Sequence, residues 1–151
     1  MKTSIVKKSY EKVMAMPRPK HRKPWKQHRF FRWLLKTISW FDLKATNGQV
    51  IATSQVYSSS ATCKKGIASV QKNAPVAGVE NQTVEGYAAE KHPKFEVYAD
   101  KAGEYRYRLF ATNGESIAIS EEGYKSKNGC IIGIKSVAVN AVNPEIVDES
   151  I

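Results

Sequence analysis

The pattern of apolar and polar residues occurs twice along the chain. Leu43–Ser54 aligns with Leu109–Ser120, and after one extra residue in the second copy Tyr57–Ala74 aligns with Tyr124–Ala141. Of the 32 positions from Leu43 to Ala74, 17 are identical in the second copy. Unrelated segments of ordinary composition agree at about one position in sixteen. The chain therefore contains a tandem duplication, and a fold predicted for one unit applies to both.

Each copy begins with a strand that alternates polar and apolar residues, seen best in Tyr105–Leu109. An Asn-Gly pair follows, which favours a tight hairpin with a type I′ turn, because that turn needs positive φ at both central residues. A second strand is predicted after the turn. The turns are Asn47-Gly48 and Asn113-Gly114, and the second strands are Val50–Ser54 and Ser116–Ser120.

A helix is predicted next in each copy. Ser59 or Ser60 can cap the first helix, and Ser126 or Asn128 the second. Apolar residues at helical spacing form one stripe that should face a sheet. The stripes are Cys63, Gly66, Ile67, Val70 and Ala74 in the first copy, and Cys130, Gly133, Ile134, Val137 and Ala141 in the second.

Gly66 and Gly133 lie in the middle of these two helices. Glycine in a helix interior costs about 1 kcal/mol relative to alanine. Its presence in both copies indicates that the helix lies very close to the sheet at this point, with a flexible hinge as the alternative.

Further strands complete the unit. Phe95–Asp100 precedes Tyr105–Leu109 and is joined to it by Lys101–Glu104, and short strands are predicted around Gln82–Tyr87 and Glu145–Val147. The unit is then β-β-β-α-β. The predicted fold class is α+β, with an antiparallel sheet from two repeats and the helices on one face.

Several phrases of the second copy resemble the YegP-like family, a group of small bacterial proteins built around a domain of unknown function, number 1508. The resemblance implies two β-β-β-α-β units in one sheet, with their last strands exchanged between the units. It also implies that a tandem repeat does in one chain what single-repeat members do as dimers, and it supplies no mechanism. The phrases are Phe95-Glu-Val-Tyr, Gly103-Glu-Tyr-Arg-Tyr-Arg-Leu, Ala111-Thr-Asn-Gly, Tyr124-Lys-Ser-Lys-Asn-Gly-Cys and Gly133-Ile-Lys-Ser-Val.

The start of the chain departs from this pattern. The first strand of repeat one is expected near Arg29–Ser39, where the sequence is unlike its counterpart, and residues 1–28 have no counterpart in the unit. Two interpretations remain open: a genuine basic extension, or a shifted reading frame upstream of about Ser39. The expected organisation is a disordered arm at 1–28, repeat one at 29–90 and repeat two at 91–151.

The net charge of +10 is concentrated in the arm. Residues 1–36 carry twelve Lys and Arg residues and one acidic residue, whereas the remainder carries twelve basic and thirteen acidic residues. Cations that alternate with aromatic rings are typical of segments that bind nucleic acids or anionic surfaces. The candidate binding residues are Arg18, Lys20, Arg22, Lys23, Trp25, Lys26, Arg29 and Arg32.

No catalytic constellation emerges from the sequence. The histidines lack partners at a defined spacing, the acidic residues cluster at turns, and Cys63 and Cys130 fall on the core stripes as buried thiols. We therefore expect a non-enzymatic binding or structural protein without metal or cofactor. Two free thiols favour the cytoplasm, and no apolar run reaches the roughly 18 residues of a membrane span.

The two helices differ outside their core stripes. Where the first carries Lys64, Lys65 and Lys72, the second carries Ile131, Ile132 and Val139. An exposed apolar helix face usually marks an interface. Helix two is therefore expected to contact another chain, a second copy or the N-terminal aromatic residues, with coverage by loops as the alternative.

Overall fold

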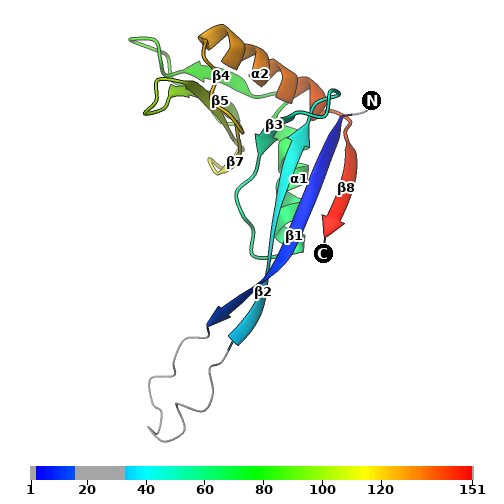
Figure 1. Cartoon of the computed structure of the whole chain (residues 1–151). Helices are drawn as coiled ribbons and strands as arrows, with labels where there is room; N and C mark the ends of the chain where they lie inside the picture. Colours follow the sequence, from blue (N-terminus) through cyan, green and yellow to red (C-terminus); the bar gives the residue numbers. More distant parts are fainter. Residues whose placement is uncertain (1–2, 16–32, 151) are drawn as a thin grey trace, which may run out of the picture.

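The computed structural model describes residues 3–15 and 33–150, and their side chains over residues 3–9 and 38–149. Within these residues the chain forms one sheet of eight strands and two helices (Figure 1). The elements, in chain order, are β1 (Ser4–Ala15), β2 (Trp33–Lys44), β3 (Val50–Thr53), α1 (Ser60–Asn73), β4 (Gly78–Asn81), β5 (Lys94–Ala99), β6 (Tyr105–Phe110), β7 (Ser116–Ile119), α2 (Lys127–Asn140) and β8 (Glu145–Ser150).

The strand order in the sheet is β4-β5-β6-β7-β3-β2-β1-β8. The α+β class is confirmed, but the prediction of a purely antiparallel sheet is wrong, because β4 pairs parallel to β5 and β8 parallel to β1. Tight hairpins enforce antiparallel pairing, whereas a parallel pair needs a connection of a dozen or more residues. Residues 82–93 provide that length between β4 and β5, and β8 and β1 lie at opposite ends of the chain.

The first strand of repeat one is β1, which corrects the predicted boundaries. Ser4–Ser9 pair with β2 and β8, just as Lys94–Ala99 pair with β6 and Lys94–Val97 with β4. Part of the segment assigned to a disordered arm is therefore a sheet strand, and the strand expected near Arg29–Ser39 is instead β2, the second strand of its repeat. Between Ser9 and Ser39 the first repeat carries residues 10–38, where the second has only residues 100–104.

The Asn-Gly turns form hairpins, but not of the predicted type. Among the described residues only glycines have positive φ, including Gly48 at 83° and Gly114 at 84°, so the preceding asparagines cannot make a type I′ turn. The Gly48 N–H donates to the Ala45 carbonyl at 2.9 Å, and the register shifts by one residue after Leu43. This arrangement fits a three-residue loop that ends in a left-handed glycine and a bulge.

The helices are built as predicted. Ser59 caps α1 by accepting from the Thr62 N–H, and Ser126 caps α2 by accepting from the Gly129 N–H. The two predicted stripes are buried and join alternate sheet residues in one core. The strand predicted at Gln82–Tyr87 is displaced to β4, at Gly78–Asn81, because the sheet pairing begins as soon as the chain leaves α1.

The predicted close approach at the mid-helix glycines is confirmed. A Cβ atom on Gly66 would meet the Tyr57 hydroxyl, and would lie 2.7 Å from the Cζ atom of that ring. A Cβ atom on Gly133 would meet the Tyr124 ring in the same way, at 2.8 Å from Cζ. Each tyrosine is joined to the sheet by a backbone bridge. The ring therefore lies between helix and sheet, and glycine makes room for it.

We predict that Gly66→Ala destabilises the protein by about 1–3 kcal/mol, because overpacking outweighs the roughly 1 kcal/mol that alanine gains as a better helix former. Urea denaturation followed by circular dichroism measures the change. Removing the clashing hydroxyl by Tyr57→Phe should recover part of the loss in the double variant. A Gly66→Ala protein more stable than the parent would show that helix propensity alone decides this position.

Candidate functional site

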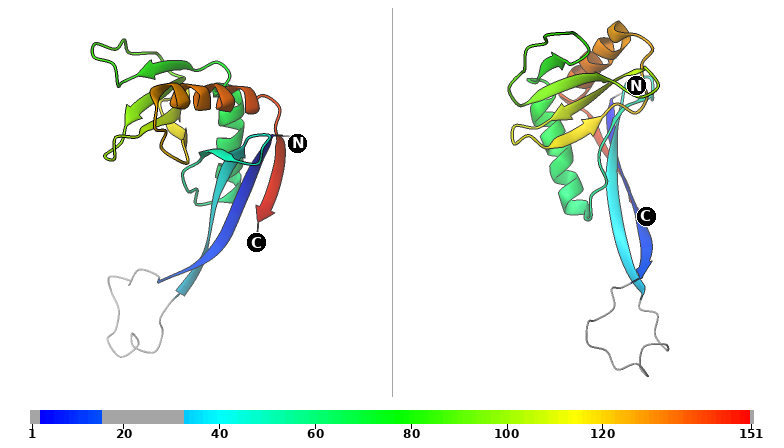
Figure 2. Two further views of the ribbon diagram at one scale, coloured as in Figure 1. Left: turned by 45° about the horizontal axis from the view of Figure 1, so that its top comes forward. Right: turned by 90° about the vertical axis from the view of Figure 1, so that its left-hand side faces the viewer.

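The β1–β2 hairpin is longer than the sheet to which it belongs. β1 and β2 pair from Ser4 and Lys44 to Ala15 and Trp33, but β8 pairs with β1 only as far as Ser9. On the other side, β3 pairs with β2 only between Asp42 and Lys44. The parts at 10–15 and 33–38 therefore form a two-stranded ribbon without a further paired strand, and this ribbon runs away from the helices (Figures 1 and 2).

The eight candidate nucleic-acid-binding residues lie between the two strands of this ribbon, in residues 16–32, outside the described residues. Sequence reasoning placed this basic segment on an N-terminal tail, whereas it connects two paired strands. It carries seven Lys and Arg residues and no acidic residue. The basic segment is thus attached to the sheet at both of its ends.

Lys7, which sequence reasoning counted among the cations of the arm, is buried in the structure with 1% exposure. It occupies the core face of β1, at the position that corresponds to Val97 in the second repeat. Its ammonium group lies 3.3 Å from the Asp148 carboxylate and donates to the Ser9 hydroxyl at 3.2 Å. The Ser9 hydroxyl bonds that of Ser39 at 2.7 Å. Lys7 therefore ties β8 to β1 within the fold.

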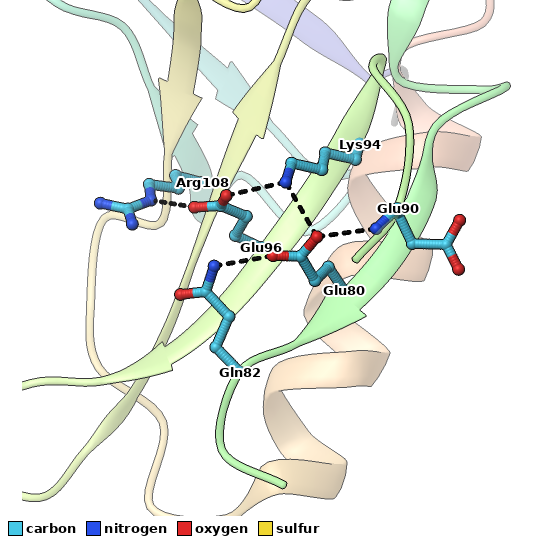
Figure 3. Close-up of polar contacts among 6 residues, drawn as sticks. All are labelled: Glu80, Gln82, Glu90, Lys94, Glu96 and Arg108. Atoms are coloured by element: carbon cyan, nitrogen blue, oxygen red, sulfur yellow. Dashed lines mark hydrogen bonds and ion pairs between the residues drawn. The ribbon is translucent and has the colours of Figure 1, made fainter. Parts of the chain in front are cut away.

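Charged side chains that sequence reasoning missed form a network on β4, β5 and β6 (Figure 3). The Lys94 ammonium group lies 2.8 Å from the Glu80 carboxylate and 3.1 Å from that of Glu96. The Arg108 guanidinium group contacts the other Glu96 oxygen at 2.7 Å. Buried charges are stable only when they are paired in this way. No short motif announces the network, because its members come from three strands.

Glu80 connects this network to the segment that follows β4. Its carboxylate also accepts from the Gln82 amide and from the Glu90 N–H, each at 2.8 Å. Hydrogen bonds from Lys94, Gln82 and Glu90 lower the pKa of Glu80 from 4.5 to about 2. All these contacts favour the ionised carboxylate. The network therefore holds the 82–93 segment against the sheet, and the lowered pKa keeps the Glu80 carboxyl group ionised at neutral pH.

Both cysteines are free and fully buried, as predicted. Burial raises the pKa of the Cys130 thiol to about 11 and also raises that of the Cys63 thiol. A thiol with a raised pKa is protonated at neutral pH and is a poor nucleophile. Among the described residues no group of three His, Cys, Asp or Glu side chains could hold a metal ion.

The three apolar residues predicted as an interface on α2 do not share one environment. Ile131 is half-buried and packs against the core. Ile132 is 58% exposed and Val139 is 72% exposed. A protein interface on α2 therefore remains a prediction that concerns Ile132 and Val139.

Within the described part of the chain no helix is long and apolar enough to cross a membrane.

We predict that Glu80→Gln lowers the free energy of unfolding at neutral pH by about 2–3 kcal/mol, because it leaves Lys94 with a weakened partner in a buried site. Since the pKa of Glu80 is lowered in the fold, its contribution is present above about pH 4.5 and is lost as the pH falls towards 2. Urea denaturation across this range should show a shallower pH dependence in the variant. Exposed Glu85 on the same segment provides the matched control Glu85→Gln, which should change little.

The chain is similar to proteins whose function is unknown. A family model described as a domain of unknown function (DUF1508) matches residues 39–81 and 100–148. A UPF0339 protein of Methanosarcina acetivorans is 59% identical over 54 residues, which cover 36% of this chain and 91% of that protein. A UPF0339 protein of Mannheimia succiniciproducens is 41% identical over 108 residues, which cover 72% of this chain and 81% of that protein.

A solved structure shares the fold. The solution NMR structure of yegP from E. coli, a protein of unknown function, superposes with a TM-score of 0.59 at 29% identity, covering 76% of this chain and 84% of that protein. The family model matches both copies of the repeat, and the second relative aligns with most of the chain. This chain is therefore a tandem-repeat member of the YegP-like DUF1508 family.

Proposed function

We propose that this chain is a non-enzymatic binding protein whose ligand is nucleic acid, contacted through the β1–β2 hairpin. The observation that carries the proposal is the place of the basic segment. Residues 16–32 connect two strands that are paired along their whole length and extend beyond the sheet. Residues 16–32 carry seven positive charges of the net charge of +10, so most of the positive charge belongs to this one segment.

The chemistry of the segment suits a phosphate backbone. Its seven cations can neutralise phosphates and release their counterions, which gives affinity without sequence preference. Trp25 and the neighbouring aromatic residues offer flat surfaces on which bases can stack. Attachment at both ends reduces the ordering that binding requires, compared with a tail held at one end.

The non-enzymatic part of the proposal is supported by the state of the reactive groups. The two thiols are buried with raised pKa values, and Glu80 and Glu96 are engaged in ion pairs with Lys94. Buried, protonated thiols and carboxylates held in ion pairs suit structural roles. We place the protein in the cytoplasm, where free thiols persist.

We further propose that the unit of the fold is β-β-β-α-β with its last strand exchanged. In support, β4 follows α1 of the first repeat and pairs with β5 of the second, while β8 follows α2 and pairs with β1 of the first. Such an arrangement fixes the position of the β1–β2 hairpin through strands of both repeats.

The binding proposal is tested by the dependence of affinity on salt. We expect full-length protein to bind a labelled single-stranded oligonucleotide at low salt, and replacement of Arg18, Lys20 and Arg22 by serine to weaken binding. The slope of log affinity against log salt should fall by about 2, because each phosphate contact contributes about 0.7. Fluorescence anisotropy measures both quantities.

Three exposed lysines of α1 provide the control, Lys64, Lys65 and Lys72 replaced by serine, which removes the same charge from a helix outside the hairpin. This control should bind as the parent does. Equal losses of affinity in the two triple variants would show that only the net charge of the protein matters. No binding of the parent protein at low salt would contradict the proposal.

Self-association through α2 is a second candidate, favoured by the exposure of Ile132 and Val139. If this face joins two copies, light scattering should show a dimer at high protein concentration, and Ile132→Lys should give a soluble monomer. Lys65→Ile is the reciprocal change, at the corresponding position of α1. A parent protein that is monomeric at every concentration would refute the interface.

A further inference from the structure

We propose that the free edge of β8 binds an extended segment of a partner protein in which basic residues alternate with apolar ones. β8 is the last strand of the sheet in the described structure and pairs only with β1. It lies at the free side of the sheet in both views (Figures 1 and 2). An unpaired strand edge is a template for one more strand. The surface is distinct from the basic segment of the hairpin, and its use does not require nucleic-acid binding.

The backbone groups of β8 that point away from β1 follow from one hydrogen bond. The Glu145 N–H donates to the Thr3 carbonyl at 2.9 Å, so the backbone polar groups of Glu145 face β1. Successive residues of a strand direct these groups to opposite sides. Ile146 and Asp148 therefore direct their N–H and C=O groups outwards. A partner strand can pair with them while the β1–β8 ladder stays intact.

The two faces of this edge differ in chemistry. Ile146 shares the core side with its register partner Ile5, and it is 50% exposed although it is a large apolar residue. Glu145 and Glu149 lie on the opposite face, and both are exposed. Cross-strand pairs of apolar residues or of opposite charges stabilise a sheet. Because side chains alternate along a strand, the matching partner alternates apolar and basic residues.

The charge of β8 selects a basic partner. The strand carries three acidic residues and no basic one, in a chain whose net charge is +10. Lys7 lies 3.3 Å from Asp148, and Glu145 and Glu149 are left to face a partner. The two glutamates disfavour a second copy of β8, because an antiparallel pair centred on Val147 would place them opposite each other.

A hollow lies beside the first residue of β8 and can receive one basic side chain of the partner. Its volume of about 490 Å³ is within the range of small-molecule sites in proteins. A carboxylate, two hydroxyls and an amide in its lining can accept hydrogen bonds from an ammonium or guanidinium group. The lining residues are Thr3, Thr46, Asn143, Pro144 and Glu145.

The opposite end of the sheet shows what closes such a place. There the Thr112 hydroxyl donates to the Asn73 amide oxygen at 3.0 Å and joins a turn of one repeat to the helix of the other. The corresponding residues beside β8 are Thr46 and Asn140, and no hydrogen bond joins them in the described structure. The 82–93 segment also packs beside β4. The fold thus closes one end of the sheet and leaves the other open.

The test measures the binding of labelled peptides to the full-length protein by fluorescence anisotropy. The probe is a capped peptide of alternating lysine and valine, six residues long like β8. It should bind at low salt and more weakly as the salt concentration rises, whereas a peptide of alternating glutamate and valine should not bind. Methylation of the backbone nitrogens of the lysines or of the valines, whichever set faces β8, should abolish binding.

Two variants of β8 test the site itself. Glu145→Lys combined with Glu149→Lys should weaken peptide binding by roughly fivefold or more. Glu85→Lys combined with Glu122→Lys makes the same change of charge at exposed positions outside β8 and should bind nearly as the parent does. Ile146→Pro removes an outward N–H and no bond of the β1–β8 ladder. It should abolish peptide binding and leave the midpoint of urea denaturation close to that of the parent.

Two longer peptides test the hollow, with an arginine added at one end or at the other. One of them should bind more tightly than the probe, and Thr46→Tyr, which fills the hollow, should remove that gain. A gain from neither arginine would contradict the role of the hollow.

Equal binding of the lysine and glutamate peptides, or of the methylated and unmethylated probes, would overturn the proposal. A parent protein that dimerises in light scattering, together with a monomeric Ile146→Pro variant, would assign the edge to a second copy and overturn it as well. Ile146→Pro should bind a labelled oligonucleotide as the parent does, so loss of peptide binding and loss of nucleic-acid binding are separate results.

Discussion

Where β3 meets β7, the two repeats are held together by the core beneath the helices, because the sheet joins them weakly at this junction. β3 and β7, the strands at the junction, are paired only at Thr53 and Ile119. On the core side Tyr107 is fully buried, and its hydroxyl donates to the Ile51 carbonyl of the other repeat. Its ring also stacks near Tyr124 and meets Phe95 edge-on. Burial of large rings contributes more than one backbone pair can, so the junction depends on this packing.

Close packing of the helices explains the repeated glycines and tyrosines. Tyr57 and Tyr124 are each bridged to the second strand of their own repeat, and each ring lies against a mid-helix glycine. A helix with a side chain at that position has to rise from the sheet, and a core packed at interior density cannot follow without losing contacts. Each copy of the repeat therefore has both the bridged tyrosine and the mid-helix glycine.

Much of the fold could be predicted because it is encoded locally and twice. Helix caps, core stripes and hairpin positions depend on residues within a few positions of one another, and two copies of each signal support one interpretation. The first strand was missed because its buried face carries Lys7, whose partner Asp148 lies near the other end of the chain. Only the fold brings Lys7 and Asp148 together. In the sequence alone, a lysine at a core position of β1 hides the alternation of apolar and polar residues that would predict a strand.

The candidate site was predictable in its chemistry and not in its place. The basic, aromatic composition of residues 16–32 is visible in the sequence, but its attachment depends on which strand pairs with which. The ion network was missed for the same reason, since its residues come together only across strands. No periodic signal marks such sites within any one strand.

The duplication also explains why the two halves can differ so much on their outer face. Residues that share a register position on the core side remain similar, as Leu43 and Leu109 do, because both fill the same kind of space. On the outer face the second repeat carries the ion network and the Arg106–Asp100 pair, whose side chains cover the sheet. On the same face the first repeat carries the Lys8–Asp42 pair, and its β1–β2 hairpin is longer than the corresponding hairpin of the second repeat. Because close packing constrains the core side only, the outer faces of the two repeats differ while their strand pairing stays the same.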